Sequence, residues 1–142
     1  MVVFIALSSL ISLVALLAFK LVGLRALWRK EIGAKSKGKR YIYVFRGRYE
    51  WFWLVKIGKA KDIYQRMSQH KTAGSPFGIH VIAVIKVTNE HKAEDVVHAR
   101  FDAEHFKNAT NGREWYWYSI RMIAYFLIVK DYALTKQVKA RY

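Results

Sequence analysis

The 142-residue sequence contains no cysteine and only 10 acidic residues, against 25 lysines and arginines. The absence of cysteine excludes disulfide bonds, thiolate nucleophiles and cysteine-based zinc sites, and it is compatible with a cytosolic location. The shortage of acidic residues leaves a formal net charge of +15. A surface of that charge attracts polyanions, so the composition implies nucleic acid or anionic lipid as a partner without separating the two.

Charged residues are also missing from the N-terminal segment. Val2 to Phe19 carries no charge, and Val2 to Leu24 contains Lys20 as its one charged residue. At about 1.5 Å per helical residue, this run is longer than a hydrocarbon layer of about 30 Å. Lys20 lies near the C-terminal end, where its long stem lets the ammonium reach the headgroups. We therefore predict a single transmembrane helix as an anchor at residues 1–24.

The alternatives to such an anchor are a cleaved signal peptide and a buried core helix. A signal peptide normally begins with basic residues and ends at a small-residue site such as A-x-A, and the segment has neither. From Arg25 to Arg48, nine basic residues accompany the single acidic residue Glu31. By the positive-inside rule, this excess predicts a single-pass protein of the inner (plasma) membrane whose domain faces the cytoplasm.

The rest of the chain divides by composition into two parts. Residues 25–40 are predicted to be a basic linker, since residues 30–40 combine Gly, Ser and Lys without hydrophobic periodicity. Residues 41–142 are predicted to form one domain with a C-terminal helix.

Patterns of β-branched and aromatic residues predict strands at 41–45, 51–57 and 80–87. The first two strands are expected to form a hairpin that ends at Gly58, and the third is expected to be the central strand of the sheet. Amphipathic patterns predict helices at 62–72, 90–106 and 120–137, the first with Asp62 as its N-cap. The expected fold class is α+β, a small central antiparallel β-sheet of about three strands flanked by helices and preceded by one transmembrane α-helix.

Five short fragments occur in an order known from one nuclease superfamily. They are Tyr41-Ile42-Tyr43, Val55-Lys56-Ile57-Gly58, the pair Arg66 and His70, Glu94, and Gly112-Arg113-Glu114-Trp115. This order resembles the GIY-YIG endonuclease superfamily, and most of all its branch best known from bacteriophage T-five proteins. The resemblance covers about residues 41–119. It implies DNA as the partner and hydrolysis of phosphodiester bonds with a divalent metal.

The resemblance implies a catalytic set of Tyr43, Lys56, Arg66, His70 and Glu94. Tyr43 matches the tyrosine that helps to deprotonate water, and with an ordinary pKa near 10 it would need a neighbouring cation such as Lys56. Arg66 and His70 are four residues apart and share one helical face. From that face Arg66 would bind the scissile phosphate and His70 would support proton transfer.

Glu94 resembles the metal-binding carboxylate of the superfamily. One glutamate completed by water and phosphate oxygens suits Mg²⁺ or Mn²⁺, which keep much of their hydration shell. A zinc site formed with His91, His98 and His105 is an alternative, because these residues lie near one face of the same predicted helix. The H-E-x-x-H pattern is absent, however, and the Glu94–His98 spacing recurs in the phage-type branch without zinc.

Two positions depart from the motif, since Lys56 stands in place of the tyrosine of YIG and Tyr41 in place of the glycine of GIY. A binding module of the same fold that has lost turnover is therefore an alternative to an endonuclease. A third is a membrane-surface protein that binds anionic lipid or a partner. No small-molecule cofactor is expected. The roles of Glu114, Asn108 and Asn111 stay open.

Residues expected to contact DNA, mainly through its phosphates, combine positions at the motifs with other basic residues. They are Tyr41, Gly58, Lys59, Arg46, Arg48 and Arg113. The aromatic residues Tyr49, Trp51 and Trp53 beside the arginines could stack exposed bases. Packing in the core or at the membrane interface is the alternative for these aromatics.

Overall fold

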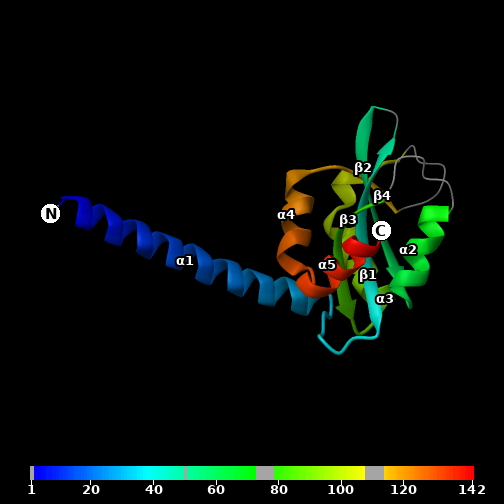
Figure 1. Cartoon of the computed structure of the whole chain (residues 1–142), viewed down its shortest axis with the longest axis horizontal. Helices are drawn as coiled ribbons and strands as arrows, with labels where there is room; N and C mark the ends of the chain where they lie inside the picture. The colour runs from blue at the N-terminus through cyan, green and yellow to red at the C-terminus, as the bar shows by residue number, and fades with distance from the viewer. Residues whose placement is uncertain (1, 50, 73–78, 108–113) are drawn as a thin grey trace.

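An antiparallel sheet of four strands forms the centre of the domain (Figure 1). The computed structural model describes residues 2–49, 51–72, 79–107 and 114–142, apart from the side chains of residues 2–6, 49 and 72. The strands are β1 (Arg40–Tyr49), β2 (Phe52–Ala60), β3 (His80–Val87) and β4 (Trp115–Trp117), in the order β3-β1-β2-β4. The predicted α+β class is confirmed, and β4 adds a fourth strand.

The helices lie on both faces of this sheet, and one extends away from it. They are α1 (Val2–Glu31), α2 (Ile63–Thr72), α3 (Glu90–Arg100), the 3₁₀ turn η1 (Asp102–Glu104), α4 (Ile120–Val129) and α5 (Tyr132–Arg141). Asp62 caps α2 as predicted, because its Oδ1 accepts from the backbone N–H of Tyr64 at 2.9 Å and of Gln65 at 3.0 Å. Asn89 caps α3 in the same way.

Alternation along β1 divides the core into two. Ile42 and Val44 pack with α3 and α4 on one face of the sheet. Tyr43 and Phe45 point to the other face, where they pack with α2 and α5. Tyr41 also packs on this face, as the alternation of side chains along a strand requires.

β3 is an edge strand, and its prediction as the central strand was wrong. Its density of Val and Ile has another cause, since both of its faces are covered and its outer edge is bonded to the start of α5. Val84 N–H donates to Thr135 Oγ1 at 3.0 Å, and Asp131 N–H donates to the Val84 carbonyl at 2.9 Å. Lys86 N–H donates to Asp131 Oδ2 at 2.6 Å. Polar groups of a helix start thus replace the missing neighbour strand.

The single final helix predicted over 120–137 is two helices. Lys130 has an extended ψ of 154°, because Asp131 is bound to β3 and ends α4 there. The helix predicted to reach residue 106 ends at Arg100, since Phe101 turns into the core against Tyr125 and Phe126. β2 continues beyond Gly58 to Ala60, where it still pairs with β1.

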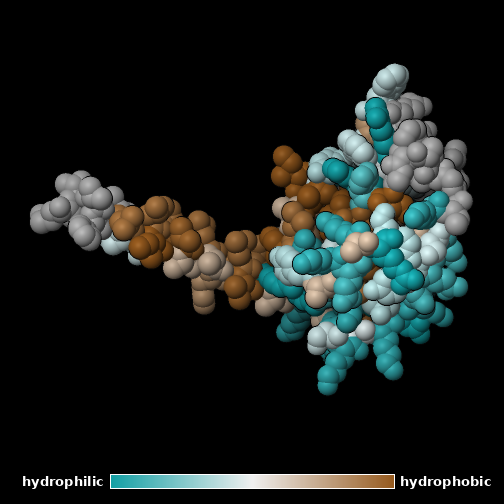
Figure 2. All heavy atoms as spheres, in the orientation of Figure 1, coloured by the Kyte–Doolittle hydropathy of each residue, from teal (hydrophilic) through white to brown (hydrophobic). Residues whose placement is uncertain are grey.

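The N-terminal helix is long and apolar enough to cross a membrane, and the described span from Leu7 is not buried against the domain. Figure 2 shows its hydrophobic surface leading to the domain.

α1 ends in a Schellman motif at Gly33, which has a φ of 64°. Gly33 N–H donates to the Lys30 carbonyl, and Ala34 N–H donates to the Arg29 carbonyl. The left-handed φ is one that glycine adopts without steric cost.

The segment expected as a linker has defined structure. Residues 25–31 continue α1, Ile32 is buried in the core, and Lys35 N–H donates to the Lys86 carbonyl at 3.0 Å. Arg25 donates to the Lys130 carbonyl at 3.0 Å, and Arg29 forms an ion pair with Asp131 at 3.0 Å. The last turns of α1 are therefore attached to the end of α4.

We predict that Thr135→Val lowers the free energy of unfolding by about 1–3 kcal/mol, because it removes the buried partner of the Val84 backbone groups at the edge of β3. Urea unfolding of the full-length chain in detergent micelles, followed by tryptophan fluorescence, measures the loss. Thr135→Ser keeps the hydroxyl and serves as the control. Equal stability of the valine and serine variants would contradict this account of the edge.

Candidate functional site

Tyr43 lies at the centre of the residues that the sequence singled out. It pairs across the sheet with Gly58, and its ring crosses the space above that glycine. A Cβ atom at Gly58 would overlap the Tyr43 phenol. Gly58 is therefore required by the position of the Tyr43 ring.

Two side chains of α2 hold the Tyr43 hydroxyl. Arg66 Nε donates to the hydroxyl oxygen at 3.2 Å, and His70 Nε2 lies 2.9 Å from the same oxygen. The spacing of four residues places both side chains on the face of α2 that meets the sheet. Phe45 packs against the imidazole from β1, with ring centroids 5.1 Å apart.

The surroundings shift the pKa values of His70 and Tyr43. Burial, together with the positive charges of Lys56 and Arg66, lowers the pKa of His70 to about 4, so its imidazole is neutral at pH 7. Burial raises the pKa of Tyr43, and the hydrogen bond and charge of Arg66 offset part of that effect. Tyr43 is therefore a neutral phenol beside a neutral imidazole that can accept a proton.

Lys56 lies on the same face of the sheet as Tyr43, opposite Phe45 in the register. Its ammonium forms an ion pair with Glu114 at 2.9 Å and lies 5.4 Å from the centre of the Trp115 ring. Glu114, whose role the sequence left open, thus holds Lys56 in place. Lys56 replaces the expected motif tyrosine with a positive charge near His70.

Glu94 approaches from α3, on the opposite face of the sheet. Its carboxylate is buried and bonded to Lys59, and His98 Nε2 lies 3.7 Å away. Burial raises the pKa of Glu94, but the hydrogen bonds and charges of His98 and Lys59 outweigh burial and hold the pKa below its usual value.

Within the described residues, β4 pairs with β2 only at 54–56. The edge of β2 around Gly58 and Lys59 therefore lies beyond the end of β4. The negative charge of Glu94 is a minor cause of the raised pKa of Tyr43.

Glu94 is common to the two metal sites that the sequence suggested. Among the described residues, no three His, Asp or Glu side chains form a group that could hold a metal ion, and so these residues give the zinc alternative no support. His98 is instead hydrogen-bonded to Tyr116 through Nδ1. The Glu94 carboxylate forms an ion pair with the Lys59 ammonium.

The residues expected to bind DNA divide into two groups. Gly58 and Lys59 lie at the site, and Tyr41 lies beside it on the face of Tyr43. Arg46 stacks over Trp53 at 4.8 Å further along the hairpin, and it lines a pocket of about 430 Å³ at the edge of β3. Arg48 lies two residues further from Tyr43. Arg113, like Asn108 and Asn111, lies outside the described residues.

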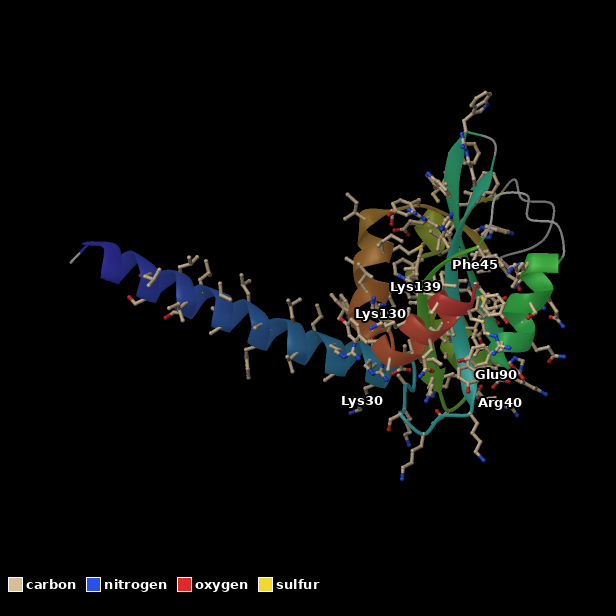
Figure 3. The ribbon with its side chains drawn as sticks, in the orientation of Figure 1. Lys30, Arg40, Phe45, Glu90, Lys130 and Lys139 are labelled. Carbon is tan, nitrogen blue, oxygen red and sulfur yellow. The ribbon has the colours of Figure 1, made fainter. Side chains whose placement is uncertain are left out.

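Sequence reasoning missed Glu90 and Tyr116, and it gave no packing partner to Trp115. Glu90 is buried one turn before Glu94 and lies 3.7 Å from Arg40 (Figure 3). Trp115 packs edge-on against Phe45, and Tyr116 reaches His98 on the opposite face. The run Trp115-Tyr116-Trp117 could have predicted β4 and the alternation of its side chains, but not their partners.

The model of one protein family, the T5orf172 domain, matches residues 40–129, more than half of the chain. The chain belongs to this family. The T5orf172 region runs from the first residue of β1 to the last of α4, so it contains the five residues of the predicted catalytic set and leaves out α1 and α5. The T5orf172 domain is associated with phages and points to a nucleic-acid-related function. Neither the curated proteins nor the solved structures contain a match to the chain.

We predict that NMR titration of the full-length chain in detergent gives His70 a pKa of about 4 and that Lys56→Met raises it towards 6.5, because one of the charges that lowers it is removed. Since the pKa in the folded state is below that of the unfolded state, His70 contributes stability that is lost as the pH falls from 6.5 towards 4. Lys56→Arg keeps the charge and should leave the value low. A His70 pKa near 6.5 in the unmodified chain would refute the arrangement.

Proposed function

We propose that this chain is a GIY-YIG-type endonuclease that hydrolyses DNA phosphodiester bonds with Mg²⁺ or Mn²⁺ and is tethered to a membrane by α1. The observation that carries the proposal is the hydrogen-bonded set of Arg66, Tyr43 and His70. It combines a fixed cation, a hydroxyl and a neutral base in one place. Family membership supports a nucleic acid as the substrate.

The set supplies a route for the proton of the attacking water. Arg66 occupies one acceptor position of the Tyr43 oxygen. In the His70 tautomer that carries its proton on Nδ1, Nε2 accepts the hydroxyl proton of Tyr43. A water molecule at the remaining acceptor position can pass a proton to Tyr43 while Tyr43 passes its own to His70. The water oxygen forms the new bond to phosphorus, and the departing sugar oxygen takes a proton from solvent. Tyr43 thus relays a proton and does not need to ionise.

Lys56 and Arg66 place two positive charges beside this route, where they would bind the phosphodiester. The same charges lower the pKa of His70 in the free protein. An anionic phosphate bound between them would offset their effect and raise the basicity of His70. The base would therefore become stronger once DNA is bound.

Glu94 would hold the metal ion, with water and phosphate oxygens as the other ligands. The bound ion would supply positive charge to stabilise the phosphoryl oxygens in the transition state. Lys59 is more exposed than Glu94 and has a flexible stem, so its ammonium can leave the carboxylate and contact a DNA phosphate instead.

The membrane tether is proposed from the length and composition of α1 and from the basic residues that follow it. With α1 across the inner membrane, the excess of lysine and arginine keeps the domain in the cytoplasm. α2 lies at the end of the domain opposite to α1 (Figure 1). The proposed active site would then be open to cytoplasmic DNA.

A DNA-binding module without turnover is the second candidate, and the Lys59–Glu94 ion pair favours it. In such a module Lys59 would stay on the carboxylate and exclude the metal ion. Lys56 at the motif tyrosine agrees with either function.

We predict that the full-length chain nicks supercoiled plasmid with Mg²⁺ or Mn²⁺ and that Glu94→Gln lowers the rate at least about a hundredfold, because a metal ligand is lost. Its DNA affinity should be unchanged or slightly higher, since one negative charge beside the phosphate is removed. Asp95→Asn changes an exposed acid on the same helix and should cut normally. If Glu94→Gln cuts the plasmid as fast as the unmodified chain, Glu94 is not the metal ligand. If the unmodified chain leaves the plasmid uncut with every divalent metal, the binding module is favoured.

We predict that DNA affinity falls about tenfold or more between low and moderate salt, because phosphate contacts release counterions from DNA. Fluorescence anisotropy with a labelled duplex measures the binding. An affinity that does not change with salt would exclude phosphate contacts as its main source.

Arg66→Ala should weaken both DNA binding and DNA cutting, since a cation on the phosphate acts in the ground state and the transition state.

A further inference from the structure

α4 is apolar on the side that faces away from the core as well as on the side that faces it. Met122, Phe126 and Val129 are buried against the sheet. On the outer side Ile120 is 84% exposed and Leu127 is 42% exposed, with the exposed Ala124 between them. The one charged residue of α4 is Arg121, which is exposed and forms an ion pair with Glu104. A helix that is otherwise apolar on all sides normally lies inside a protein or in contact with lipid.

The attachment of α4 to α1 indicates what covers this outer side. Arg25 donates to the carbonyls of Ile128 and Lys130, and Arg29 donates to that of Val129. These bonds satisfy the last carbonyls of α4, which have no partner within the helix. They also fix the C-terminal end of α4 beside the last turns of α1.

This attachment sets the depth of α4 relative to the bilayer. Arg25 and Arg29 follow the apolar run of α1, so they would lie at the level of the headgroups. α4 runs across the direction of α1 on the side of the domain from which α1 leaves (Figure 1). Figure 2 shows hydrophobic surface on α1 and again on α4 beside it. If α1 crosses the membrane, α4 lies along its surface.

Aromatic residues at both ends of α4 agree with that depth. Trp117 and Tyr118 precede the helix and are each 44% exposed, and Tyr132 follows it and is 59% exposed. The Tyr132 ring has Arg25 at 5.1 Å and Lys130 at 4.9 Å from its centre. Exposed Trp and Tyr rings beside basic groups are typical of the membrane–water interface.

We propose that α4 is a second membrane contact, which lies in the interface with Ile120, Ala124 and Leu127 in the lipid. The proposal rests on α1 spanning the membrane, as in the proposed function. Two contacts fix the orientation of the domain, whereas α1 alone would allow it to tilt. The fixed orientation directs α2 and the Tyr43 site away from the bilayer, whose anionic lipids would repel DNA.

The absence of cysteine makes a direct test available, because one introduced cysteine carries one fluorescent label. The full-length chain is reconstituted into vesicles of phosphatidylcholine and phosphatidylglycerol. Labels at Ile120→Cys and Leu127→Cys test α4, Leu13→Cys reports on α1, and Gln65→Cys on the exposed side of α2 is the matched control. Quenching by brominated lipid is compared with quenching by aqueous iodide.

We expect brominated lipid to quench the labels at 120 and 127 at least about threefold more than the label at 65, because an interfacial helix places its apolar face about 5–10 Å into the bilayer. Quenching at 120 and 127 that equals that at 65, with strong quenching at 13, would overturn the α4 contact and leave the α1 span standing. A label at 13 without lipid quenching would overturn both.

A second variant separates lipid contact from folding. Ile120→Glu should at least halve the lipid quenching of a label at Leu127, because a carboxylate resists entry into the hydrocarbon. Ile120 is 84% exposed, so the change leaves the core intact, and circular dichroism checks this. Unchanged quenching at Leu127 in this variant would also overturn the proposal.

Discussion

The register between β1 and β2 is the constraint on which the site depends. It sets Tyr43 opposite Gly58, the one residue type that leaves room for its ring, and Phe45 opposite Lys56. A slip of one residue would move every side chain of a strand to the other face of the sheet. Tyr43 would then leave α2, and the hydrogen bonds to Arg66 and His70 would be lost. The glycine of the second motif fragment is thus explained by packing.

A second constraint lies where four elements meet at Asp131. Its carboxylate binds Arg29 of α1 and the backbone N–H of Lys86 in β3, and its own N–H donates to Val84. The same residue ends α4 and begins α5. The apolar N-terminal helix is therefore continuous with the domain through polar contacts. This continuity gives α1 a defined direction relative to the site on α2.

Charge has two effects in this protein. The excess of lysine and arginine attracts polyanions to the whole surface, as any strongly basic protein does. Near Tyr43, burial together with the positive charges of Lys56 and Arg66 lowers the pKa of His70, while Glu114 and Glu94 hold two lysines in ion pairs. Acidic residues are few in the sequence, and these two are placed where they position cations. In the proposed function, the DNA-binding surface and the proton-transfer site would share these cations.

The sequence by itself determined the features that depend on neighbouring residues. Alternation, capping and helical spacing were enough to predict the α+β class, the Asp62 cap, the shared face of Tyr43 and Phe45, and the pairing of Arg66 with His70 on one helical face. The tertiary structure alone decided that β3 lies at an edge and that the helix predicted over 120–137 is interrupted at Asp131. It also decided that Glu94 contacts Lys59 and that Arg25 contacts the end of α4. Local patterns follow from backbone geometry within a few residues. Contacts between residues far apart in the chain depend on how the elements pack, and no local pattern records which partner each side chain meets.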